Sequence, residues 1–141
     1  MSEEAPDRKA TILVYSDDRS TRGQVRLALG RRVAADLPEI EIVECATHQA
    51  VTKTLDAGGI DVVIMDGEAV PAGGMGLCRQ VKDEIANCPP VVLMVARVAD
   101  AWLATWSNAD AVVAYPIDPV RLPASVADVL RARLSSEANA R

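Results

Sequence analysis

The sequence predicts an α/β domain built on a five-stranded parallel sheet. Five short runs rich in β-branched residues recur along the 141 residues, at positions 11–16, 40–46, 61–65, 91–95 and 111–114. Stretches with the helical spacing of apolar residues separate these runs, so that strand and helix patterns alternate five times. Strict alternation of this kind requires right-handed crossovers, and therefore a parallel sheet. The chain has no Phe, and a core of aliphatic side chains suits a sheet that is buried on both faces.

Each helical stretch has its own signals. Residues 20–35 place Val25, Leu29 and Val33 on one stripe, after a Ser-Thr pair that can cap the N-terminus. Residues 48–57 end at a Gly-Gly pair, residues 77–86 end before a Pro-Pro pair, and residues 100–107 contain both tryptophans. Asp118 and Pro119 are typical of an N-cap and a first helical position. They open a last helix with an apolar stripe at Leu122, Val126, Leu130 and Leu134.

Five strand–helix units fit the doubly wound, flavodoxin-like strand order 2-1-3-4-5. The run at 40–46 alternates partly with glutamates, so we expect it at an edge of the sheet. The length fits one domain, which we place at residues 11–134. Residues 1–10 and 135–141 are predicted to be flexible tails.

Charge and composition exclude several classes of function. The net charge is −5, and the Arg31-Arg32 and Arg131/Arg133 pairs have the helical spacing of solvated faces, so we expect no nucleic-acid binding. The N-terminus does not resemble a signal peptide, and no apolar run approaches the roughly 20 residues of a membrane helix, so we expect a cytoplasmic protein without direct membrane insertion. Cys45, Cys78 and Cys88 are expected to be reduced, buried thiols.

Acidic residues follow two strands that should be neighbours in the sheet. Asp17 and Asp18 follow the first strand, and Asp66 follows the third. In a doubly wound sheet these strand ends flank the point where strand order reverses, which is where ligands bind. We therefore expect the three carboxylates to converge, and Mg²⁺ is their natural occupant because it prefers oxygen ligands. The alternative is that Asp17 or Asp18 only caps the first helix.

Four segments in this order resemble the receiver domain of bacterial two-component response regulators. They are LVYSDDRST at 13–21, DVVIMD at 61–66, PVVLMVA at 90–96 and AVVAYPIDPVRL at 111–122. The resemblance implies that Asp66 is the phosphoacceptor. It also implies that Asp18 and Asp66 bind Mg²⁺ directly, that Asp17 assists through water, and that the backbone carbonyl of Glu68 completes the protein ligands.

Departures from the family pattern point to an atypical receiver, or pseudo-receiver. Ala96 stands where the family has a hydroxyl residue, Tyr115 where it has a lysine, and Val112 where it has a large aromatic. Phosphorylation adds about −1.5 to −2 charge, which the neutral phenol cannot balance. We therefore expect phosphorylation of Asp66 to be slow or without conformational effect, and Mg²⁺ to bind weakly or not at all. Arg97 is a candidate internal counter-ion for the acids, with exposure to solvent as the alternative.

The resulting prediction is a stand-alone protein-interaction module rather than an enzyme. Trp102 and Trp106, four residues apart, are candidates for the partner surface. Of the two, we expect Trp102 to fill the core and Trp106 to be exposed. The chain most resembles orphan actinobacterial receivers associated with NADH:quinone oxidoreductase (complex I), which implies docking on the cytoplasmic arm of that enzyme. One alternative is a genuine phosphoacceptor in a phosphorelay. Another is a flavin-phosphate binder using residues 20–23, which the neighbouring acids and scarce aromatics disfavour.

Overall fold

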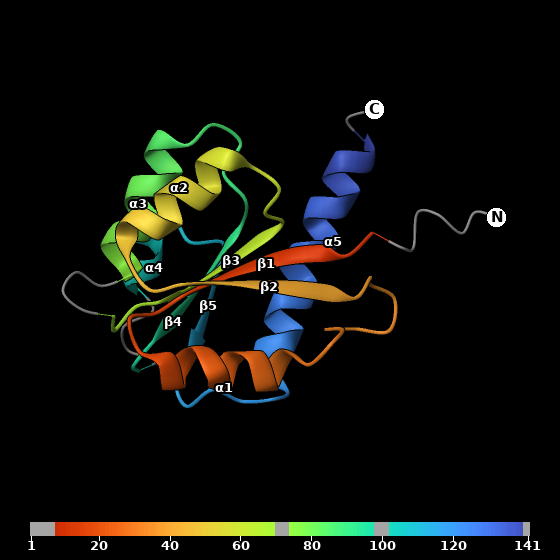
Figure 1. The fold of residues 1–141 in the computed structure, drawn as a ribbon, viewed down its shortest axis with the longest axis horizontal. Coiled ribbons are helices and arrows are strands. Elements are labelled where there is room, and N and C mark those ends of the chain that lie inside the picture. The colour runs from red at the N-terminus through yellow and green to blue at the C-terminus, as the bar shows by residue number, and fades with distance from the viewer. Residues whose placement is uncertain (1–7, 70–73, 98–101, 140–141) are drawn as a thin grey trace.

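A computed structural model describes residues 8–69, 74–97 and 102–139 of the chain. Strands and helices alternate along these residues, as the sequence predicts (Figure 1). The elements are β1 (Ala10–Tyr15), α1 (Arg19–Leu29), β2 (Ile40–Cys45), α2 (His48–Ala57), β3 (Val62–Asp66), α3 (Gly74–Glu84), β4 (Val91–Val95), α4 (Trp102–Ser107), β5 (Ala111–Ala114) and α5 (Arg121–Asn139).

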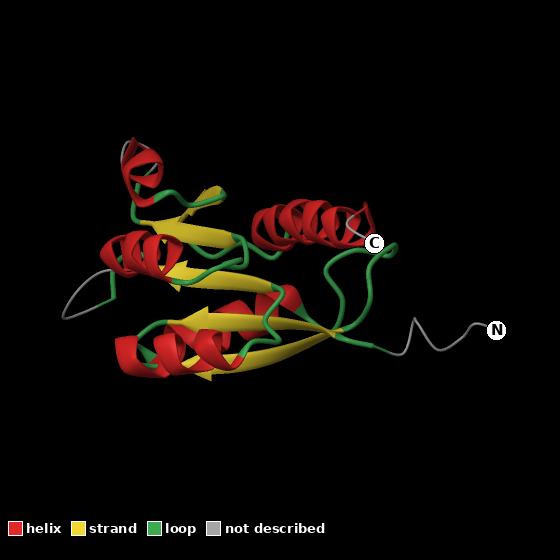
Figure 2. Cartoon of the chain, turned by 90° about the horizontal axis from the view of Figure 1, so that it is seen from above, coloured by secondary structure: helices red, strands yellow, loops and turns green. Residues whose placement is uncertain are grey.

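The five strands form one parallel sheet in the order β2-β1-β3-β4-β5. Figure 2 shows the twist that parallel strands of L-residues adopt. In register, Tyr15 of β1 lies opposite both Cys45 of β2 and Met65 of β3. The carboxyl ends of β1 and β3 therefore meet at one rim. The predicted fold class, strand order and edge position of β2 are confirmed.

Two aliphatic clusters cover the two faces of the sheet. Helices α1 and α5 pack on one face, through residues that include Val25, Leu29, Leu122, Val126 and Leu130. Helices α2 and α3 pack on the other, through residues that include Val51, Leu55, Leu77, Cys78 and Val81. Strands β3 and β4 are buried along their whole length. This burial fixes β3, and with it the position of Asp66, between two packed layers of helices.

Several helix boundaries differ from the prediction, and α3 spans Gly74–Glu84 where 77–86 was predicted. Helix α1 ends at Leu29, because Gly30 adopts φ +63° and its N–H bonds to the carbonyl of Arg26. Helix α5 begins at Arg121, after Asp118 Oδ1 accepts the N–H groups of Val120 and Arg121. It then continues to Asn139, past the domain end predicted at 134.

Among the described residues, no helix combines the length and the apolar character needed to cross a lipid bilayer.

Candidate functional site

The centre of the site is Asp66, the last residue of β3, whose exposed fraction is only 4%. Its Oδ2 accepts a hydrogen bond from Ser16 Oγ at 2.7 Å. Its Oδ1 accepts from Tyr115 Oη at 2.6 Å and from the backbone N–H of Glu68 at 2.9 Å. Both carboxylate oxygens are therefore engaged by donors of the chain itself, two of which are uncharged hydroxyl groups.

Ser16 is the residue of this site that the sequence analysis missed. It follows β1 directly and is fully buried. Its Oγ accepts the N–H of Asp18 at 3.0 Å, so its hydroxyl hydrogen is left to point at Asp66. Its position as the last residue of the first predicted strand was the available signal, because the carboxyl ends of the adjacent parallel strands β1 and β3 lie side by side.

The two acids that follow Ser16 lie at the surface. Asp17 and Asp18 are both exposed. Asp18 Oδ1 accepts the N–H of Ser20 at 2.8 Å and is the N-cap of α1, which is the alternative role considered from the sequence. The described residues, which include Asp17, Asp18 and Asp66, hold no group of three His, Cys, Asp or Glu side chains arranged to bind a metal ion. The predicted convergence of the three carboxylates into a ligand set is therefore not observed.

A magnesium ion held by the predicted ligands would compete with donors of the chain itself. One oxygen of Asp66 already accepts two hydrogen bonds and the other accepts one, and Asp18 is engaged in capping. Glu68 contributes its N–H to Asp66. A divalent ion prefers anionic and carbonyl oxygens, and it would share the Asp66 carboxylate with the two hydroxyl donors or displace them. Mg²⁺ binding through these residues remains a prediction.

Tyr115 follows β5 and is half-buried, with its N–H bonded to the carbonyl of Val95 at 2.8 Å. Burial raises the pKa of its phenol, and the hydrogen bond to Asp66 and the negative charge of Asp66 raise the pKa further. The phenol is therefore a neutral donor at pH 7. In the place where the family has a cation, this chain has a group that binds Asp66 without compensating its charge.

The other predicted switch positions lie close to the same rim. Ala96 and Arg97 directly follow β4 and are exposed. Val112 lies within β5, is half-buried, and packs against the cluster under α2 and α3. That Arg97 serves as a counter-ion for the acids stays a prediction.

The tryptophans of α4 are both at the surface. Trp106 is 48% exposed, as predicted, but Trp102 is 68% exposed, so the expectation that it fills the core is wrong. The two clusters that cover the faces of the sheet contain no indole ring. Arg79 of α3 lies over the Trp106 ring at 4.9 Å from the centroid and donates to the Trp106 carbonyl at 2.7 Å. The two indoles thus form an exposed pair, one of which is held by a guanidinium.

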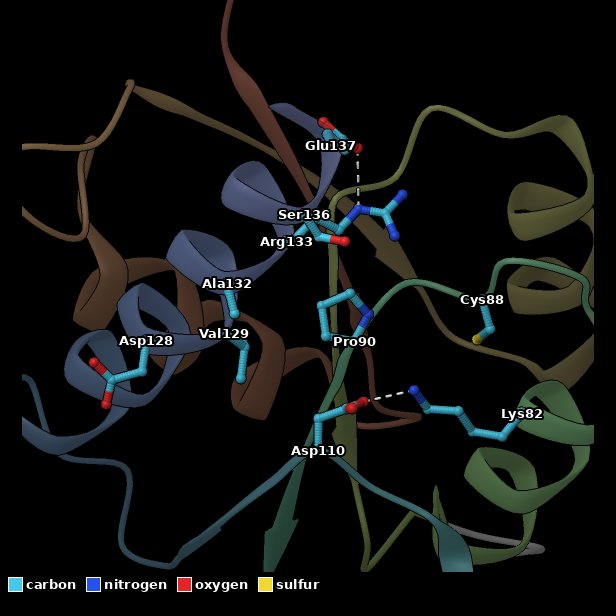
Figure 3. Close-up of a pocket in the computed structure, with 10 residues that line it drawn as sticks. All are labelled: Lys82, Cys88, Pro90, Asp110, Asp128, Val129, Ala132, Arg133, Ser136 and Glu137. Carbon is cyan, nitrogen blue, oxygen red and sulfur yellow. Dashed lines mark hydrogen bonds and ion pairs between the residues drawn. The ribbon is translucent and has the colours of Figure 1, made fainter. Parts of the chain in front are cut away.

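A cavity of about 460 Å³ opens far from Asp66, between α3, α5 and the starts of β4 and β5 (Figure 3). Four of its charged side chains form two ion pairs, Lys82 with Asp110 and Arg133 with Glu137. Cys88, one of three free cysteines, also lines it. It contains none of the predicted site residues, so the candidate site remains at the carboxyl ends of the strands.

Comparisons with known proteins agree with this fold. No protein-family model matches the chain. An uncharacterized response regulatory protein of Mycobacterium tuberculosis, found in the strains CDC 1551 and H37Rv, is 51% identical over 121 residues, which cover 86% of this chain and 91% of the relative.

Two solved structures share the fold at low identity. A receiver domain protein of Methanospirillum hungatei superposes with a TM-score of 0.70 at 16% identity, covering 92% of this chain and 99% of that one. A Thermotoga maritima response regulator in complex with Mg²⁺-BeF gives 0.69 at 21% identity, covering 85% and 98%. At such identities these structures show the fold alone. The relative at 51% identity shows the family: the chain belongs to the response regulators and has the fold of their receiver domain.

Proposed function

We propose that this receiver is a protein-interaction module whose partner binding does not depend on phosphorylation. The observation that supports the proposal most directly is the engagement of both Asp66 oxygens by Ser16 and Tyr115. A carboxylate attacks a phosphodonor with one of these oxygens. In this chain both oxygens accept hydrogen bonds, which lower their nucleophilicity and make the attack slower.

A modified Asp66 would also lack the contacts that turn modification into a change of shape. A ligand shifts a conformational equilibrium only through contacts that differ between the two states. Ala96 offers no hydroxyl to a phosphoryl group, and Tyr115 offers no positive charge. Ala96 therefore cannot donate a hydrogen bond to a phosphorylated Asp66, and Tyr115 can donate one but cannot balance its negative charge.

The proposed partner is the cytoplasmic arm of NADH:quinone oxidoreductase, and the chain would reach the membrane only through that complex. The support for this partner is the family resemblance. The proposed contact surface is the exposed pair of Trp102 and Trp106 on α4, because large exposed aromatic side chains commonly anchor interfaces. In this role the chain is an accessory subunit without catalytic activity.

The alternative function is a genuine phosphoacceptor in two-component signalling. It is favoured by the position of Asp66 at the carboxyl end of β3, in a chain that belongs to the response regulators. A receiver of this kind would exchange its two hydroxyl contacts for a phosphoryl group and a metal ion. The two functions differ in what modification of Asp66 does.

The test is native affinity purification of the tagged chain from its own cells, followed by identification of what co-elutes. Asp66→Asn is the matched variant, because it keeps the shape of the side chain and removes the nucleophile. We expect the same subunits of the respiratory enzyme with the wild-type chain and with Asp66→Asn. Recovery of a kinase alone, or loss of the partner in Asp66→Asn, would favour the phosphoacceptor.

Acetyl phosphate and Mg²⁺ give the second measurement, with mass spectrometry of Asp66 as the readout. We expect slow, substoichiometric modification. Rapid stoichiometric modification, accompanied by a change in partner binding, would contradict the proposal.

A further inference from the structure

A continuous hydrogen-bonded chain crosses the carboxyl rim of the sheet from one edge strand to the other. It runs from Glu44 of β2 through Arg22 of α1, Ser16 after β1 and Asp66 of β3 to Tyr115 after β5. We call these five residues the rim network. Its two ends lie at opposite edges of the sheet, because β2 and β5 are the two edge strands.

Arg22 is the member of the rim network that holds Ser16. Its Nη1 donates to the Ser16 carbonyl at 2.7 Å, and its Nε donates to Glu44 Oε1 at 2.9 Å. The Arg22 side chain is only 14% exposed, so its guanidinium is fixed between these two acceptors. A planar guanidinium holds its donors in a fixed fork, which suits it to bridge two such acceptors in one geometry.

Ser16 has no unused polar group once Arg22 is in place. Its N–H donates to the Cys45 carbonyl, its carbonyl accepts from Arg22, and its hydroxyl accepts from Asp18 and donates to Asp66. Ser16 is fully buried, so its carbonyl would lose its partner without Arg22. A buried polar group without a partner is costly, and the turn that follows β1 would move to reach water.

We infer that Arg22 is a positioning residue, which acts through Ser16 to keep a hydroxyl donor on Asp66 Oδ2. The inference rests on the proposed restraint of Asp66 and names the residue that maintains it. Arg22 itself contacts neither oxygen of Asp66. Its effect on Asp66 therefore depends on Ser16, and must disappear when the serine hydroxyl is removed.

Helix α1 offers a matched control for Arg22. Arg26 also pairs with Glu44, at 2.8 Å, but its side chain is 52% exposed and it makes no contact with Ser16 among the described residues. Arg22→Gln and Arg26→Gln each remove one charge and one partner of Glu44. Only Arg22→Gln should release Ser16.

The experiment compares wild type, Ser16→Ala, Arg22→Gln, Arg26→Gln and the double variant Ser16→Ala/Arg22→Gln in the folded, full-length chain. The first readout is the carboxyl carbon resonance of Asp66 in NMR spectra, which reports on the donors to that group. We expect Ser16→Ala and Arg22→Gln to move it in the same direction. Arg26→Gln should leave it in place, and the double variant should match Ser16→Ala.

The second readout is the rate at which acetyl phosphate modifies Asp66. In this reaction a carboxylate oxygen bonds to phosphorus and acetate leaves. Losing a hydrogen bond to a charged acceptor should accelerate it about tenfold in Ser16→Ala and in Arg22→Gln. The double variant should be no faster than Ser16→Ala.

Three results would overturn the inference: an Arg22→Gln spectrum that matches wild type, an Arg26→Gln spectrum that matches Arg22→Gln, or additive effects in the double variant. The resonance decides between these outcomes even if no variant accepts phosphate. A wild-type chain that is modified rapidly would contradict the proposed function, whereas the comparison of Arg22 with Arg26 would still test the positioning role.

Discussion

Tyr115 donates its phenol hydrogen to Asp66 across 2.6 Å, and so joins the end of β5 to the end of β3. Strand β4 lies between these two strands in the sheet. The bond therefore ties together three of the five strands at the rim. It also places an uncharged ring beside the residue that would carry a phosphoryl group.

Replacing Tyr115 with Phe should lower the free energy of unfolding by about 1.5 kcal/mol at pH 7. The substitution keeps the ring and removes one hydrogen bond to a charged acceptor, a bond of the class worth roughly 1.5–3 kcal/mol. Urea unfolding would measure the change. Tyr15→Phe is the control, because the Tyr15 hydroxyl makes no hydrogen bond in the described part of the chain. An equal loss in both variants would contradict the special role of Tyr115.

Stability should fall as the pH rises above about 10. Burial and the contact with Asp66 raise the pKa of Tyr115 above its ordinary value of 10.0, so the folded state keeps the phenol proton when the unfolded chain releases it. Unfolding then liberates a proton, and each further increase in pH favours unfolding. Urea midpoints across this range would show the decline. Tyr115→Phe should make this loss of stability with pH smaller. Part of the loss will remain, because burial also raises the pKa of Tyr15.

Restoring the two missing groups should restore a response to phosphorylation. Tyr115→Lys supplies the cation and Ala96→Thr supplies the hydroxyl, and charge-assisted hydrogen bonds are roughly twice as strong as neutral ones. We expect the double variant to be modified by acetyl phosphate about tenfold faster than wild type, with NMR shifts that extend to β5 and α4. The two single variants are the controls. A double variant that behaves like wild type would show that other features of the chain also prevent a response to phosphorylation of Asp66.

The tryptophan pair should matter for binding and little for folding. Trp102 is 68% exposed, so Trp102→Ala should change the free energy of unfolding by less than about 0.5 kcal/mol. If it anchors the partner, the same change should weaken the complex roughly thirtyfold, which corresponds to about 2 kcal/mol. Leu27→Ala on α1 is the matched control, because Leu27 is 84% exposed on a different helix. Equal partner recovery with both variants would exclude α4 as the contact surface.

The three cysteines should differ sharply in reactivity toward iodoacetamide. Cys78 is fully buried, its thiol donates to the Ser107 carbonyl at 3.3 Å, and burial raises its pKa to about 11. At pH 8 only about one Cys78 in a thousand would be a thiolate. Cys88 is half-buried and should be alkylated first. Peptide mapping with and without urea would give the order, and early labelling of Cys78 would contradict the packing of α3.

The sequence predicted the sheet correctly because burial leaves a short apolar run at each strand, which glutamates interrupt only in the edge strand β2. The end of α1 was predicted too late because Val33 continues the apolar spacing. That residue reaches the core from the loop after Gly30, where a left-handed backbone has already ended the helix. Apolar spacing reports which side chains are buried, and it does not report which backbone conformation carries them.

The acceptor of the site was predictable, but its partners were not. Asp66 stands at a strand end that the pattern identifies, whereas Ser16 lies 50 residues away and is not ionisable. Its role depends on strand register to a single residue. From the sequence, Tyr115 was identified only as a neutral residue at the position where the family has a lysine. That its phenol reaches Asp66 depends on ring orientation, which composition and spacing do not determine.

Trp102 was expected to fill the core because the chain has no Phe. The structure shows that aliphatic side chains fill both layers without an indole. The core therefore contains few aromatic side chains, and the two tryptophans lie at the surface.

The surface position of both indoles gives this protein an unusual optical signature. Its two tryptophans lie on α4, and the only aromatic side chain that is fully buried is Tyr15 among the described residues. Intrinsic fluorescence will therefore start from solvent-exposed emission and shift to shorter wavelengths when another molecule covers α4. Without a label, the native chain carries its own reporter of whatever binds that helix.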